Sequence, residues 1–176
     1  MNILDTIIEH KLLEVAAAKK LIPFEQLSAG KYYNRETFSL KQFLLDEQKT
    51  GIIAEFKRRS PSKGVINADA DISAVTRAYA QHGASCLSIL TDGHFFGGSP
   101  ADIDSARFNN IPILRKDFMI DEYQVAEAKA MGADVILLIA ACLSPQRVKE
   151  LAAFAQSLKL EVNNRHLRFI FSGNDC

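Results

Sequence analysis

Charged side chains stand at the ends of two apolar segments in this sequence. Glu55 and Lys57 close the run Gly51–Lys57, and Lys116 follows the run 112–115. Residues two apart in a strand point to the same face, so Glu55 and Lys57 would share one side of a strand. A buried acid and base are costly unless they pair or meet a ligand. Two lysines and one carboxylate therefore suit an anionic substrate, and a lysine in such a site can act as a general acid.

Plainer interpretations of these residues also exist. Glu55 and Lys57 could form a structural pair, and a lysine at a strand end could be a solvated charge. Phe95 and Phe96 precede two glycines, which allow a tight bend, so the rings could form a wall for a flat ligand or pack in the core. The four histidines and three cysteines have no spacing typical of a metal or redox site, so no metal is predicted.

A regular alternation of elements must position these side chains. Apolar spacing predicts helices over 2–20, 24–29 and 38–45, a leader of about 47 residues without a strand. Short apolar runs then predict strands over 51–57, 84–90, 112–115, 133–140 and 160–162. Helices are predicted between them over 71–82, 100–108, 121–131 and 144–158, with N-caps at Asp121 and Ser144 and a stop at Gly132. This order indicates parallel βα units, in an open sheet or a closed barrel, and in both the ligands bind at the carboxyl ends of the strands.

Composition narrows the function classes. The 176 residues are 48% hydrophobic and 24% charged, as in an ordinary globular chain. Because 21 basic residues balance 21 acidic ones, without a basic stripe, nucleic acid is not an expected partner. No run is long enough to predict a membrane span, and the start lacks a signal-peptide core, so a cytoplasmic location is expected.

Several segments resemble indole-3-glycerol-phosphate synthases. They are the stretch Ile53–Ile66, the pair Leu87–Asp92 and Phe95–Ser99, Pro112–Gln124, and Gly132–Ile139. The start, from Ile3 to Val15, is similar to the helical extension that this family carries before its barrel. The resemblance implies an α/β fold, a TIM (β/α)8 barrel with an N-terminal helical extension, of which this chain would hold a part. It also implies a carbon–carbon lyase of tryptophan biosynthesis that needs no cofactor and converts 1-(2-carboxyphenylamino)-1-deoxyribulose 5-phosphate into indole-3-glycerol phosphate, carbon dioxide and water.

The resemblance assigns roles to individual residues. Lys116 resembles the general acid that protonates the substrate carbonyl, Lys57 the lysine that pairs with the substrate carboxylate, and Glu55 the carboxylate that orients both lysines. Positions that line the family's pocket correspond to Ser60, Phe96, Phe118 and Leu137. The expected partner is thus a small anionic aromatic sugar phosphate.

The match changes towards the C-terminus. We expect a leader over 1–47, the first half of a barrel over 48–162 and a divergent tail over 163–176, because a full barrel typically needs about 250 residues. The tail resembles a later family segment in which Asn163 and Arg165 would contact substrate, which implies an internal deletion; a frameshifted tail is the other explanation. The family's glutamate general base has no counterpart, so weak or no activity is expected of this chain, along with self-association through open barrel edges.

Two further hypotheses remain. The chain could be a non-catalytic half-barrel, either a fragment or a complementing subunit. A phosphoribosylanthranilate isomerase is disfavoured, because that reaction has no evident need for Lys57 and Lys116.

Overall fold

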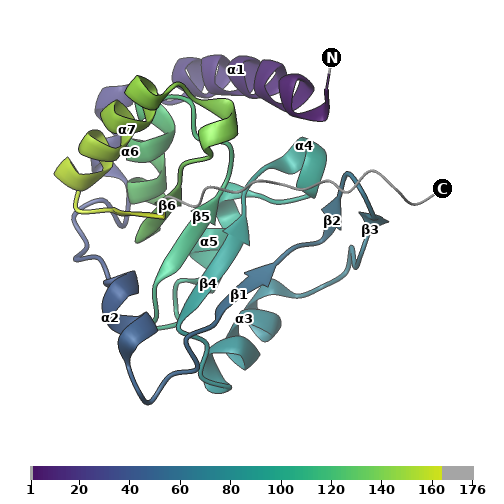
Figure 1. Cartoon of the computed structure of the whole chain (residues 1–176), viewed down its shortest axis with the longest axis vertical. Coiled ribbons are helices and arrows are strands. Elements are labelled where there is room, and N and C mark those ends of the chain that lie inside the picture. The colour runs from purple at the N-terminus through teal and green to yellow at the C-terminus, as the bar shows by residue number, and fades with distance from the viewer. Residues whose placement is uncertain (1, 164–176) are drawn as a thin grey trace.

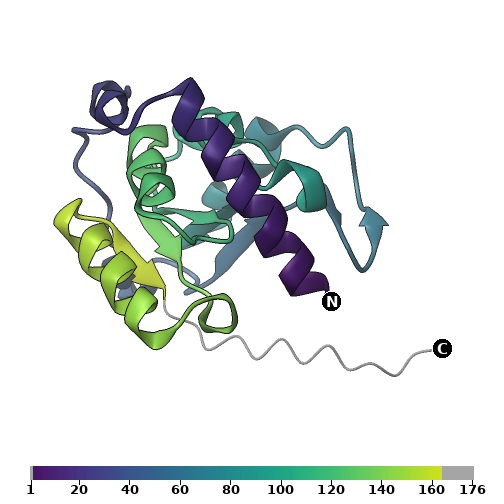
Figure 2. The same cartoon turned by 90° about the horizontal axis from the view of Figure 1, so that it is seen from above.

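A curled parallel sheet forms the centre of the molecule, and a long helix lies across its carboxyl ends (Figures 1 and 2). The computed structural model describes residues 2–163. Its main sheet has five parallel strands in the order β1-β4-β5-β6-β7. Their bounds are Ile53–Phe56, Cys86–Leu90, Ile113–Lys116, Val135–Leu137 and Glu161–Asn163. The five predicted strands are confirmed, and the architecture is that of a partial TIM barrel.

Helices follow the strands and cover one face of the sheet. They are α3 (Ile72–Gln81), α5 (Pro100–Ala106), α6 (Glu122–Met131) and α7 (Pro145–Ser157). The main core lies between these helices and the sheet, and includes Ile72, Leu87, Ile89, Ile103, Ile113, Val125, Ile136 and Leu151. Apolar strands are needed here because the central strands are buried on both faces. β4 shows this most clearly, since all of its residues are buried.

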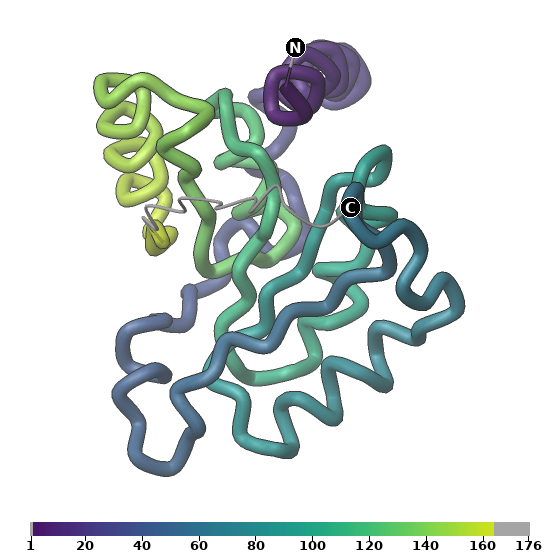
Figure 3. Tube along the Cα trace, turned by 45° about the vertical axis from the view of Figure 1, so that its right-hand side comes forward, coloured from purple at the N-terminus to yellow at the C-terminus, as the bar shows by residue number. Residues whose placement is uncertain are grey.

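The leader consists of α1 (Ile3–Leu21), the 3-10 helix η1 (Phe24–Ala29) and α2 (Leu40–Leu45). α2 supports the concave face of the sheet from below, where Leu40 packs in a second cluster with Leu114 and Val135. α1 lies at the opposite end and is viewed almost along its axis in Figure 3. Since α2 packs on the sheet and α1 packs on α6, the predicted division between 1–47 and 48–162 stays a prediction.

A buried carboxylate fastens the leader to the amino ends of the strands. Asp134 is fully buried and pairs with Arg35 of the leader and, at 2.6 Å, with Arg107. Its Oδ1 and Oδ2 also accept hydrogen bonds of 2.8 Å from the backbone N–H groups of Phe38 and Ile113. This arrangement pairs the buried charge fully, which is the condition for tolerating it.

Predicted helix ends agree with the structure. Asp121 caps α6 in a capping box with Gln124, and Gly132 ends the helix with φ +99°. Ser144 caps α7, whose first residue is Pro145. These residues satisfy backbone groups that a helix leaves unpaired at its ends, which explains why the boundaries could be predicted.

Two small elements were not predicted. Residues expected as loop contain a hairpin of β2 (Arg59–Ser60) and β3 (Gly64–Val65), and the short helix α4 (Gly93–Phe96). Both are too short for a periodic pattern. The buried face of α1 also differs from the one that the apolar positions predict, since Leu12 is 57% exposed whereas Lys11 is fully buried. No helix among residues 2–163 is long and apolar enough to cross a bilayer.

Candidate active site

Glu55 joins the two lysines that the sequence singles out. Its Oε2 lies 2.8 Å from Lys116 Nζ, and its Oε1 lies 3.0 Å from Lys57 Nζ. Glu55 lies in β1, Lys57 directly follows that strand, and Lys116 ends β5, with β4 hydrogen-bonded between the two strands. The three side chains are only 26–32% exposed. The sheet therefore brings together an acid and two bases that are 61 residues or less apart in the sequence.

The electrostatics keep Glu55 ionised. Burial alone would raise the pKa of Glu55, but Lys116 and Lys57 outweigh it and lower the pKa below its ordinary value. The carboxylate thus holds two ammonium groups side by side whose remaining N–H donors can turn to an incoming anion.

These lysines open into a cavity of about 1010 Å³ at the carboxyl ends of the strands. That is where parallel βα folds bind their ligands. The cavity wall includes all four pocket residues expected from the sequence, together with both lysines: Lys57, Ser60, Phe96, Lys116, Phe118 and Leu137. A cavity of this size can enclose a drug-sized molecule.

Two aromatic rings form part of the wall. The ring centroids of Phe96, in α4, and Phe118, just after β5, lie 6.2 Å apart with planes inclined at 35°. Phe95 instead packs edge-on against His10 and His94, away from the lysines. Phe96 therefore lines the cavity, as one interpretation of the sequence predicts. Phe95 is half-buried against the leader helix and belongs to none of the core clusters of the described residues.

The last two expected site residues are placed differently. Asn163 ends β7 opposite Leu137, and its carbonyl oxygen accepts a 3.4 Å hydrogen bond from Leu138 N. It is not among the residues that line the cavity. Arg165 lies outside the described residues, so the two explanations of the tail stay open.

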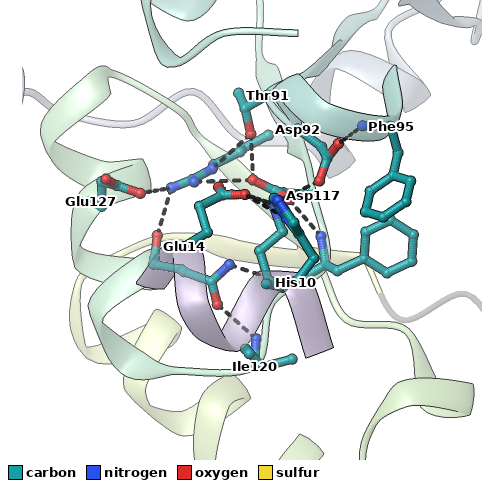
Figure 4. A network of polar contacts seen from close by, with 12 residues as sticks. His10, Glu14, Thr91, Asp92, Phe95, Asp117, Ile120 and Glu127 are labelled. Carbon is teal, nitrogen blue, oxygen red and sulfur yellow. Dashed lines mark hydrogen bonds and ion pairs between the residues drawn. The ribbon is translucent and has the colours of Figure 1, made fainter. Parts of the chain in front are cut away.

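The sequence analysis missed the contribution of the leader helix to this site. The cavity is lined by Ile3, Leu4 and Ile7 of α1 and by Asn2, which caps this helix. Further along the helix, Lys11 contacts the carboxylates of Asp92, after β4, and Asp117, after β5. Figure 4 shows the network around these two carboxylates. A signal was present in the sequence, because Ile7 and Val15, four residues to either side of Lys11, are apolar; in the structure both are buried. A lysine between them lies on the buried stripe of the helix.

A buried polar network surrounds this lysine. Asp117 is fully buried; its Oδ2 accepts hydrogen bonds from Thr91 Oγ1 at 2.7 Å and from Arg115 at 3.1 Å. Burial alone would raise the pKa of Asp117, but Arg115 and Lys11 outweigh it and lower the pKa. Arg115 reaches Glu127 at 2.7 Å as well. The network fixes the chain on both sides of Lys116.

No ring of metal ligands exists in the part of the chain that the structure describes, where no three His, Cys, Asp or Glu side chains gather as a metal site would require. The chemistry available at the cavity is that of ammonium groups, a carboxylate and aromatic walls. Positioned cations of this kind stabilise charge that develops during a reaction when water is excluded.

Fold and site together define a class: a parallel (β/α) barrel, here described in part, with a lysine-lined cavity at its carboxyl end. Comparison with known proteins identifies the family within that class. Residues 4–164 match the family model of indole-3-glycerol phosphate synthase. The chain is 50% identical over 162 residues to the indole-3-glycerol phosphate synthase of Bacteroides thetaiotaomicron, and 46% identical over 164 residues to that of Burkholderia multivorans.

This chain belongs to the indole-3-glycerol phosphate synthase family. Each alignment covers 92% of the chain, which spans 62% and 63% of the lengths of the two relatives.

Proposed function

We propose that the cavity carries out the reaction of indole-3-glycerol phosphate synthases, the ring closure and decarboxylation of 1-(2-carboxyphenylamino)-1-deoxyribulose 5-phosphate. The observation that carries this proposal is the bridge of Glu55 between Lys57 and Lys116 at the mouth of a cavity with phenylalanine walls. The substrate is a flat aromatic ring with a carboxylate and a phosphate. Its ring suits the apolar walls, and its anionic groups suit the lysines.

Lys116 is proposed as the general acid. Its ammonium group would protonate the substrate carbonyl oxygen while the ring carbon that bears the carboxylate attacks the carbonyl carbon. One carbon–carbon bond forms in this step, and loss of carbon dioxide then returns the electron pair to the ring. The new hydroxyl group takes a second proton from the Lys57 ammonium group and leaves as water. The carbon that was the substrate's CH2 group then returns a proton to the Lys57 amine, which completes the indole, and Lys116 regains its proton from solvent. A positioned acid of this kind typically contributes about 100- to 10,000-fold in rate.

Lys57 and Glu55 are proposed as its partners. Lys57 would pair with the substrate carboxylate until carbon dioxide leaves and would assist the later proton transfer. Glu55 would keep both ammonium groups oriented, as it does through contacts of 2.8 and 3.0 Å in the structure. Ser60, Phe96, Phe118 and Leu137 would enclose the substrate.

A turnover assay tests this proposal. Purified chain is mixed with the substrate, and product is followed by the fluorescence of the new indole ring; binding of indole-3-glycerol phosphate is measured by calorimetry in parallel. Because the family's glutamate general base has no counterpart in this chain, we expect weak product formation, and we expect it to fall by at least about 100-fold in Lys116→Met. The matched control is Lys41→Met, on the exposed side of α2 and remote from the cavity.

The outcomes separate the hypotheses. Absence of both turnover and binding would overturn the proposal. Binding without turnover would overturn the catalytic part and leave the non-catalytic half-barrel as the function. Equal rates in wild type and Lys116→Met would exclude Lys116 as the acid.

Self-association and location belong to the same proposal. β1 and β7 are the outer strands of the described sheet, so each offers one side for pairing with another strand. We propose that copies of the chain associate along these edges, and light scattering that gives a monomer mass at all concentrations would refute it.

A cytoplasmic location is proposed because a phosphorylated substrate stays inside the cell, and cell fractionation would test it.

A further inference from the structure

Lys11 is a completely buried lysine in the leader helix. Its Nζ lies 2.9 Å from Asp92 Oδ2 and 2.9 Å from Asp117 Oδ1, and donates hydrogen bonds of 3.0 and 2.9 Å to Glu14. Burying an ammonium group is tolerated only when carboxylates compensate it. Lys11 therefore connects α1 to two loops of the barrel that are distant in the sequence.

Each of these carboxylates also organises its own loop. Asp92 Oδ1 accepts a 2.7 Å hydrogen bond from Phe95 N and thereby caps α4, the helix that carries Phe96. Asp117 Oδ1 accepts a 2.9 Å hydrogen bond from Phe118 N. Both loops thus hold an aromatic ring of the cavity wall in place through a carboxylate that Lys11 contacts.

The two carboxylates depend on Lys11 to different degrees. Asp117 Oδ2 has Thr91 and Arg115 as additional partners. Asp92 Oδ2 is buried and accepts no hydrogen bond from the described residues, so its ion pair with Lys11 is what compensates its charge. Loss of the ammonium group would therefore disturb the Asp92 loop most.

We propose that Lys11 is a positioning residue of the active site: its ammonium group holds the leader helix against the cavity and sets the spacing of the Phe96 and Phe118 walls. Only the expected effect of Lys11 on substrate binding rests on the proposed function. The ring centroids now lie 6.2 Å apart. The same helix lines the cavity with Ile3, Leu4 and Ile7, so release of Lys11 would loosen the cavity on two sides.

Hydrogen–deuterium exchange tests the connection without any ligand. In the full chain with Lys11→Met, we expect amide exchange to rise about tenfold in residues 2–8, 92–98 and 117–120, while α7 and β6 keep wild-type rates. The control is Lys19→Met on the same helix. Lys19 Nζ lies 2.7 Å from Asp121 Oδ2, and both side chains are partly exposed. A uniform rise over the whole chain, or none at 92–98, would overturn the proposal and leave Lys11 a purely structural residue.

Asp92→Asn supplies a second variant in case Lys11→Met fails to fold. The amide oxygen can still cap α4, but the charge that Lys11 faces is lost, and exchange should rise in the same three segments. An unchanged pattern in this variant would count against the proposal.

Binding of indole-3-glycerol phosphate tests the consequence. We expect the dissociation constant to increase about tenfold in Lys11→Met and to stay within about twofold of wild type in Lys19→Met. Equal affinities for wild type and Lys11→Met would refute the role of Lys11 in the cavity. If wild-type chain binds no ligand, the proposed function fails, and the exchange experiment still decides whether Lys11 positions the two loops.

Discussion

Replacing Glu55 by glutamine should tighten the binding of an anion while it slows catalysis. The carboxylate occupies two ammonium groups at 2.8 and 3.0 Å and competes with an incoming anion for their donors. Glutamine keeps the size and polarity of the side chain but removes its charge. The charge of the Glu55, Lys57 and Lys116 group then rises by one unit.

The size of the effect follows from the geometry. An anion on the free side of the Lys116 ammonium would lie roughly 5 to 6 Å from the Glu55 carboxylate, the sum of two ammonium–oxygen contacts. At that separation two unit charges repel by about 0.8 kcal/mol in water and by about 3 kcal/mol at an effective dielectric constant of about 20. Because the Glu55 side chain is 31% exposed, we take the lower part of this range. An effect of about 1 kcal/mol corresponds to roughly fivefold tighter binding.

Calorimetric titration with a reduced substrate analogue, which keeps the aromatic carboxylate, measures this effect. The gain should shrink when the ionic strength rises from about 0.05 to about 0.5 M, because salt screens partly exposed charges. Glu122→Gln is the matched control, since it makes the same charge change beside Arg147, remote from the cavity. Unchanged or weaker binding in Glu55→Gln, with no salt dependence, would refute the electrostatic account of the site.

The remaining predictions concern the support of the site. Asp117→Asn should lower the free energy of unfolding by about 3 kcal/mol at pH 7, because it removes the charge that compensates two buried cations. Urea titrations measure this. The control is Asp104→Asn, at an exposed carboxylate, which should cost less than about 1 kcal/mol. Burial would raise the pKa of Asp117, but the neighbouring cations lower it by more. The pKa of Asp117 in the folded chain is therefore below its value in the unfolded chain. Its stabilisation is thus present above about pH 4 and is lost as the pH falls through the folded pKa, and the gap between wild type and Asp117→Asn should narrow in acid; a constant gap would contradict this. Gly98→Ala should destabilise the chain by about 1–3 kcal/mol, since a Cβ there would lie 2.1 Å from the Leu90 carbonyl oxygen. Gly93→Ala should be nearly neutral, because the nearest atom to its Cβ would lie at 3.5 Å. Thermal unfolding that ranks the two variants oppositely would refute the predicted loop packing.

The strands could be predicted because a parallel sheet buried on both faces demands apolar runs. Their ends could not be predicted equally well. The run 133–140 predicts a strand of eight residues, but β6 covers only Val135–Leu137. Leu138 and Ile139 are buried as the pattern requires, yet the chain turns into the 3-10 helix η2 (Ala140–Cys142). Hydrophobicity reports burial, and burial does not require strand pairing.

The lysines and the carboxylate of the site could be singled out because charges at the ends of apolar strands need an explanation. The role of Lys11 escaped, since a search for periodic apolar residues passes over a lysine even when it lies on the buried stripe between Ile7 and Val15. The separate orientations of Phe95 and Phe96 were equally hidden. The orientations of these two rings depend on the start of α4, which Asp92 caps. A helix of four residues is too short for a periodic pattern that would predict it.

An NMR titration tests the central claim most directly, the claim that Lys57 and Lys116 share one cavity that binds an aromatic anion. Backbone amide signals of nitrogen-15-labelled chain are followed as indole-3-glycerol phosphate is added. We predict shifts confined to the carboxyl ends of β1, β4, β5 and β6 and to the first turns of α1. Shifts around Asp134 at the opposite end of the sheet, or no shifts at saturating ligand, would contradict the account.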